Sequence, residues 1–108
     1  MRTKLILALA VSALAVTTAR SDDVKATYDK ECTKCHGADG KGETKMGKKL
    51  GAKDYTDAKV QDALKDDAAY KAIKEGLAKD DKTLMKPAEG LSDDQIKGLI
   101  AYMRSFKR

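Results

Sequence analysis

The chain has 108 residues, of which 42% are hydrophobic and 36% charged, but only 5% are aromatic. This length excludes a multi-domain enzyme, and a core with so few large side chains is marginal unless a cross-link, a metal or a bound cofactor adds to it. Two cysteines exclude a disulfide-rich scaffold, and one proline with eight glycines excludes a collagen-like or low-complexity chain.

The chain begins with the three-part layout of a secretory signal peptide. Residues 1–4 are basic, residues 5–16 carry no charge, and small residues follow up to Ala19. The apolar run is too short to span a bilayer comfortably, which disfavours an uncleaved anchor. We therefore expect cleavage of residues 1–19, which leaves a periplasmic domain of residues 20–108 without a transmembrane segment.

Cleavage also changes the charge balance. The formal net charge of +5 includes Arg2 and Lys4, and without them 20 basic residues remain against 17 acidic ones, a net charge of +3. So small an excess of positive charge does not indicate nucleic-acid binding.

The first predicted element of the domain is a helix over residues 22–35. Val24, Tyr28 and Cys32 recur at every fourth position, as residues on one face of a helix do. The following stretch, residues 37–53, contains five glycines and predicts a loop.

The second half of the chain predicts three more helices and no strand. Residues 57–64 predict a short helix, and residues 67–75 predict a longer one that Gly76 ends. In the last helix, Ser92 and Gln95 have the spacing of a capping box. Its apolar stripe consists of Ile96, Leu99, Ile100, Met103 and Phe106. The pattern as a whole predicts an all-α fold with long loops.

Residues 32–36 contain both cysteines and the single histidine of the chain, in the order Cys32-Thr33-Lys34-Cys35-His36. This C-x-x-C-H pattern is typical of c-type haem attachment. Two thiols three residues apart on a helical turn each form a thioether to one haem vinyl group, and the imidazole that follows binds the iron as an axial ligand. The sequence therefore predicts a covalently bound haem c, which also supplies much of the missing core.

Three other interpretations of the cysteine pair are less favoured. A thioredoxin-like redox site needs a strand–helix context, and no strand pattern is present. A structural zinc site needs four ligands, and the cysteines and the histidine make three. A plain disulfide between Cys32 and Cys35 explains neither His36 nor the shortage of aromatic residues.

The sixth iron ligand is a methionine in this interpretation, since the chain has no second histidine. Met1 leaves with the signal peptide, and Met103 lies on the packed stripe of the last helix. Met46 and Met85 remain, each in a stretch that predicts no regular structure. Spacing alone places Met85 ahead of Met46 and leaves both open.

From about residue 24 to residue 106 the chain resembles the class I cytochromes c. The resemblance is most specific at residues 32–37, which form C-x-x-C-H-G, and it extends over the glycine-rich loop that follows. An aromatic residue, Tyr28, stands four positions before the first cysteine, and the last helix carries Leu-x-x-Tyr as Leu99 and Tyr102.

The resemblance implies a fold in which the first and last helices cross near Tyr28 and long loops wrap around one haem. It implies that His36 is the proximal iron ligand and that Met85, in a Met-x-Pro segment with Pro87, is the distal one. One departure from the family is Val24, because glycine is usual where the two helices touch. A wider or shifted crossing is therefore expected.

The resemblance further implies a carrier of single electrons, not an enzyme. Two alternatives remain: a haem protein for catalysis or gas binding, and the cytochrome subunit of a larger oxidoreductase. Residues 34–53 contain six lysines against two acids, whereas residues 54–81 contain eight acids against five lysines. This polarity is ordinary for a solvated surface, and it also suits a lysine-rich surface for acidic redox proteins. We expect a monomer.

Overall fold

The computed structural model describes residues 21–108, so the predicted signal peptide and its cleavage site lie outside the described residues. This part of the chain is mainly helical, as predicted, and none of its helices is both long and apolar enough to cross a membrane. The elements are α1 Ser21–Glu31, α2 Thr33–His36, α3 Lys45–Leu50, α4 Ala58–Ala63, α5 Asp66–Glu75, β1 Leu77–Lys79, β2 Lys82–Met85 and α6 Asp93–Arg104.

The core lies where α1 crosses α6. Tyr28 of α1 is fully buried, and its ring lies 4.9 Å from that of Tyr102 and 5.4 Å from that of Phe106, measured between ring centroids. Ile96 and Leu99 are the other large side chains that are buried almost completely. The predicted crossing of the terminal helices near Tyr28 is therefore confirmed.

The crossing accommodates Val24 because the opposing position on α6 is a glycine. A Cβ atom placed on Gly98 would lie 2.9 Å from Cγ2 of Val24, which is closer than van der Waals contact. Val24 itself is only 8% exposed. The small residue at this contact is thus found on the last helix instead of the first.

Local signals explain where α6 begins and where α5 ends. Ser92 accepts a hydrogen bond from the Gln95 backbone, and the Gln95 side chain accepts one from the Ser92 backbone, so the predicted capping box is present. The helix α5 ends at Gly76, as predicted, with φ of +80°.

Two segments contain secondary structure that the sequence did not predict. The glycine-rich stretch contains a helix, α3, and residues 77–85 form an antiparallel hairpin of two short strands. The turn of the hairpin is Asp80-Asp81, in which φ is +53° and +62°. The prediction of no strand was therefore wrong for this segment, although the fold is otherwise helical.

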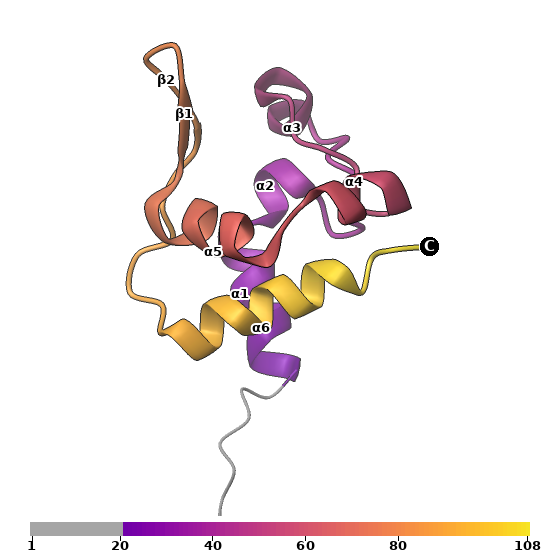
Figure 1. The fold of residues 1–108 in the computed structure, drawn as a ribbon, viewed down its shortest axis with the longest axis vertical. Coiled ribbons are helices and arrows are strands. Elements are labelled where there is room, and N and C mark those ends of the chain that lie inside the picture. The colour runs from indigo at the N-terminus through magenta and orange to yellow at the C-terminus, as the bar shows by residue number, and fades with distance from the viewer. Residues whose placement is uncertain (1–20) are drawn as a thin grey trace, which may run out of the picture.

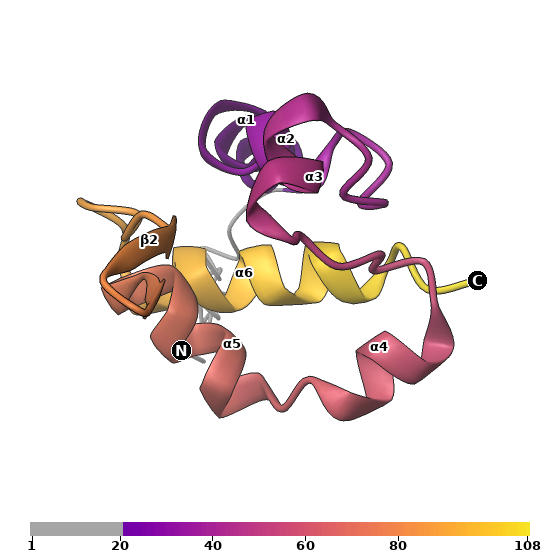
Figure 2. The same cartoon turned by 90° about the horizontal axis from the view of Figure 1, so that it is seen from above.

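Figure 1 shows the hairpin β1–β2 and the pair α2–α3 rising on the same side of α6. Seen from above in Figure 2, the hairpin, α5, α4 and α3 follow one another around a ring of backbone, and α6 runs beneath it. The segments that carry His36 and Met85 therefore belong to one side of the molecule.

Candidate haem-binding site

The two cysteines and the histidine lie at the junction of α1 and α2. The predicted helix over residues 22–35 is interrupted at Cys32, the N-cap of α2, whose N–H still donates to the Tyr28 carbonyl at 2.8 Å. The N–H groups of Cys35 and His36 both donate to the Cys32 carbonyl, at 3.3 and 3.0 Å. One tight turn therefore brings all three side chains together.

Both thiols are free, so the structure does not contain the alternative disulfide. Cys32 is only 7% exposed, and Cys35 is half-buried. Burial, with smaller contributions from the charges of Glu31 and Cys35, raises the pKa of the Cys32 thiol to about 11. A thiol with so high a pKa is protonated at neutral pH.

The imidazole of His36 is held without the hydrogen bond that a structural histidine makes. Its Nδ1 atom is buried and has no partner, although buried polar atoms in proteins are nearly always paired. Burial lowers the pKa of His36, which keeps the ring neutral, and the neutral ring is the form that binds metals. The ring of Tyr55 packs against it at 5.4 Å between centroids.

The N-terminus of the short helix α3 is hydrogen-bonded to this turn. The Oγ1 hydroxyl of Thr44, its N-cap, shares its one proton between the carbonyls of Lys34 and Cys35, at 2.7 and 2.8 Å, and accepts from the Gly47 N–H at 2.9 Å. A Cβ atom on Gly47 would lie 2.2 Å from the Cys35 carbonyl oxygen, so only glycine allows α3 to approach this closely.

Met85 stands on a different element, at the end of β2. It pairs with Leu77 across the hairpin, and its half-buried side chain packs against the core. The Ala88 N–H donates to the Ile73 carbonyl at 2.9 Å, which ties the segment after Met85 to α5. A Cβ atom on Gly76 would lie 2.6 Å from the Met85 carbonyl oxygen. The expected irregular loop is therefore a strand end with a fixed backbone.

Met46, the other methionine left open by spacing, lies on α3 and not in an irregular loop. It is half-buried and takes no part in the main hydrophobic cluster. Met103 lies in that cluster and is 8% exposed, which confirms its predicted packing position on the last helix.

Tyr55 is a neighbour of the site that the sequence reasoning missed. It lies in the segment between α3 and α4, 19 positions after His36, with no motif around it. Its N–H donates to the Gly40 carbonyl at 2.8 Å, which places it beside the loop that follows His36. Its position beside the site follows from contacts with residues distant in sequence, so no local sequence signal could have predicted it.

Residues 21–107 match the sequence family described as cytochrome c. The chain belongs to the cytochrome c family. A cytochrome c carries covalently bound haem c with its iron, and haem c is therefore the cofactor of this chain. The family match agrees with the all-α fold and leaves no place for the thioredoxin-like or zinc interpretations.

Two solved structures support this membership. The structure titled "KustC0563 c-type cytochrome" is 33% identical, with a TM-score of 0.67, and the match covers 78% of this chain and 96% of the other. A structure of a Kustc0563 mutant with a single tyrosine-to-phenylalanine change is 32% identical, with a TM-score of 0.66, over 79% of this chain and 99% of the other. Among curated protein sequences no significant match is found.

The residues of this cytochrome c are suited to the haem that the family carries. A neutral imidazole with an unpaired buried nitrogen directly follows two free thiols on one helical turn. The backbone around this turn is fixed by Thr44 and Gly47, so the three side chains keep their relative positions.

Proposed function

We propose that this cytochrome c carries single electrons between proteins. In this proposal Cys32 and Cys35 form the two thioethers, His36 is the proximal iron ligand and Met85 is the distal one. The observation that carries the proposal is the imidazole of His36, buried with an unpaired nitrogen beside two free thiols.

The bound haem supplies a ferric–ferrous couple, and the chain's residues set the conditions for it. Cys32 and Cys35 fix the group covalently, so a small core suffices to retain it. Tyr55 packs on the His36 ring and keeps water away from it. Pro87 and the hairpin limit the freedom of Met85, which lowers the entropy lost when its sulfur binds. A methionine ligand and a dry site both favour the ferrous state.

The distribution of lysines supports an acidic partner. The lysines of residues 34–53 lie around α2 and α3, and none of them forms an ion pair with a residue in the described part of the chain. They leave a positive surface beside the candidate site, and such a surface speeds association with a negatively charged partner at low ionic strength. We further propose that the protein works in the periplasm as a monomer after removal of residues 1–19.

Electron transfer to an anionic and to a cationic small oxidant tests this surface. The double variant Lys48→Glu/Lys49→Glu on α3 should slow oxidation by the anionic complex and weaken its dependence on salt. The matched control Lys59→Glu/Lys71→Glu changes the charge by the same amount on α4 and α5. Equal effects of both variants on the anionic reaction would show that only net charge matters.

Visible spectra with a redox titration test the function itself. The reduced protein should show the sharp bands of a c-type cytochrome, a single one-electron titration, and no change when carbon monoxide is added. Immediate binding of carbon monoxide would favour the alternative of gas binding or catalysis, because it requires an open iron face. Comigration with another protein on size exclusion of a native extract would favour the oxidoreductase subunit.

A further inference from the structure

Gln61 is the only buried polar residue in the described part of the chain, at 3% exposed. Its Nε2 atom donates to the carbonyls of Tyr55 and Met103, at 2.6 and 2.9 Å, and its Oε1 accepts from Arg104 at 2.9 Å. Both donors and the acceptor of the amide are thus used. The amide joins α4 and the segment just before it to the end of α6, which lies 42 positions further along the chain.

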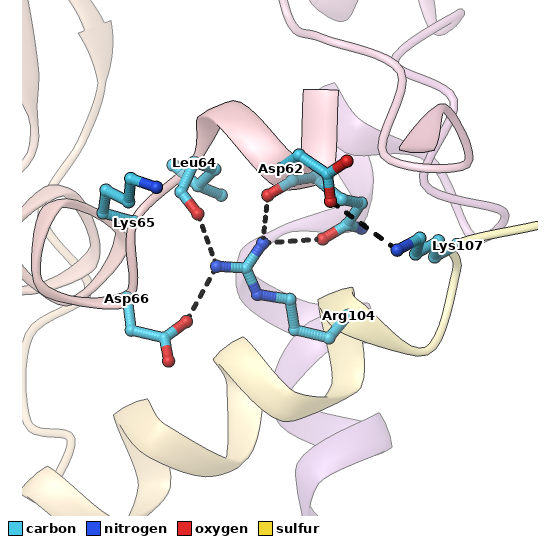
Figure 3. Close-up of a pocket in the computed structure, with 7 residues that line it drawn as sticks. Asp62, Leu64, Lys65, Asp66, Arg104 and Lys107 are labelled. Carbon is cyan, nitrogen blue, oxygen red and sulfur yellow. Dashed lines mark hydrogen bonds and ion pairs between the residues drawn. The ribbon is translucent and has the colours of Figure 1, made fainter. Parts of the chain in front are cut away.

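Arg104 completes this connection from α6. Its Nη1 atom also donates to the Gln61 carbonyl at 2.6 Å, and Nη2 donates to the Leu64 carbonyl at 2.5 Å and to Asp66 at 2.8 Å. Figure 3 shows the guanidinium pointing into the turn between α4 and α5. The planar fork of arginine suits such a set of acceptors, whereas the single ammonium of lysine does not. We call Gln61 and Arg104 together the Gln61–Arg104 clamp.

The clamp acts on the residue that packs against His36. Tyr55 is fixed on both sides of its backbone, because its N–H donates to Gly40 and its carbonyl accepts from Gln61. Burial of its ring raises the pKa of Tyr55, so the phenol stays neutral. The position of this ring over the imidazole therefore depends on hydrogen bonds that originate on α4 and α6.

We propose that Gln61 and Arg104 are positioning residues for the proximal side of the haem, acting through Tyr55. The inference rests on the proposed role of His36 as an iron ligand. Loss of the clamp frees the Tyr55 backbone, lets the ring move from the imidazole and admits water. Water near the iron stabilises the more highly charged ferric form, so the reduction potential falls.

Two conservative variants of the holoprotein test the clamp. Gln61→Glu keeps the acceptor for Arg104 but removes both donors, including the one to Tyr55. Arg104→Lys keeps the charge but loses the fork, and it serves if Gln61→Glu fails to fold. The matched control is Lys107→Met, which breaks an exposed 3.6 Å ion pair with Asp62 at the same end of the molecule. A surface pair of this kind contributes little.

Three measurements report on the positions of Tyr55 and the His36 imidazole, and not only on the stability of the protein. Hydrogen exchange of the Tyr55 amide should speed up by about tenfold or more in both clamp variants, because exchange follows local opening. The hyperfine-shifted haem methyl resonances of the ferric protein should move, since they depend on the orientation of the axial imidazole. The reduction potential should fall. Lys107→Met should change none of the three.

Tyr55→Leu gives an independent check, because it removes the ring and leaves the clamp in place. It should lower the potential and move the methyl resonances as the clamp variants do. If the clamp variants lower only the unfolding temperature and leave the Tyr55 amide, the methyl resonances and the potential unchanged, the proposal is wrong. It is equally wrong if Lys107→Met has the same effects.

Failure of the proposed ligand set would look different. It would appear in the unaltered protein, as a spectrum without histidine ligation. The Tyr55 amide would still show whether the clamp holds this residue: faster exchange in the variants would support the clamp, and unchanged exchange would overturn it.

Discussion

Cys32 and Cys35 differ in their surroundings although they lie on one turn, since Cys32 is buried in the hydrophobic cluster that contains Tyr28, whereas Cys35 is half-buried. If both are thioether residues, the haem should stay with the protein in acid–acetone extraction, and the mass should exceed that of the mature chain by one haem. Cys32→Ala and Cys35→Ala should each lower the holoprotein yield severely. Lys34→Ala, an exposed change on the same turn, should leave the yield normal. Free extraction of haem would contradict the assignment.

Met85 and Met46 allow a matched test of the distal ligand, because both are half-buried. Met85→Ala should abolish the weak ferric absorption band in the red that marks an iron–sulfur bond. It should also lower the potential and let carbon monoxide bind ferrous iron, because the distal position is then open. These properties are measured by absorption spectra and redox titration.

Met46→Ala is the control and should show only a small packing effect. The reverse pattern, in which Met46→Ala removes the band and Met85→Ala keeps it, would identify Met46 on α3 as the distal ligand.

At the scale of single elements, the hairpin contains an unfavourable turn. Asp80 and Asp81 both have positive φ, a conformation that costs non-glycine residues about 1 kcal/mol or more. A two-residue turn of this type prefers glycine at its second position. Asp81→Gly should therefore raise the free energy of unfolding by up to about 1 kcal/mol, as measured by urea titration.

The opposite change checks that this effect comes from the backbone. Asp81→Ala removes the same carboxylate but adds no freedom at positive φ, so it should destabilise the protein by about 1 kcal/mol. Equal gains from both variants would point to charge repulsion between the two aspartates instead.

The elements that the sequence could not predict each have a physical reason. Helix α3 was hidden because Gly47 and Gly51 suggested a loop, yet Gly47 is required inside the helix by the approach of the Cys35 carbonyl. The hairpin strands have three and four residues and are mostly exposed, so they show no alternation. The capped helix α6, in contrast, was predictable because its capping box and apolar stripe are local signals.

At the scale of the whole molecule, the hydrophobic core is small. Only Tyr28, Ile96 and Leu99 are large side chains with almost no exposure in the described residues. So little buried apolar area does not offset the loss of chain entropy. The haem-free chain should therefore be largely disordered at room temperature, as judged by circular dichroism.

A haem-free chain with native-like helicity and a cooperative thermal transition would contradict the prediction.

Contacts between distant parts of the sequence limited what could be predicted at the site. The proposed attachment residues, Cys32, Cys35 and His36, lie within five consecutive positions and were predicted from spacing alone. The contacts that surround them are not local: Gln61 bonds to a carbonyl 42 positions away, and Tyr55 packs on a histidine 19 positions before it. No periodicity or motif encodes such pairs, because they form only when distant parts of the chain come together in the fold.

The contact between Val24 and Gly98 has a consequence for exchanging parts between relatives. In class I cytochromes c the glycine at this contact is usually on the first helix, whereas this chain has Gly98 on the last helix facing Val24 on the first. The two helices of this chain are therefore complementary to each other. A chimaera that joins a glycine-containing first helix from a relative to this chain's last helix would place glycine against Gly98 and leave a cavity at the crossing. In the reverse chimaera, any side chain at the position of Gly98 would come too close to Val24 and force the helices apart. The first and last helices should therefore be exchanged between relatives only as a pair.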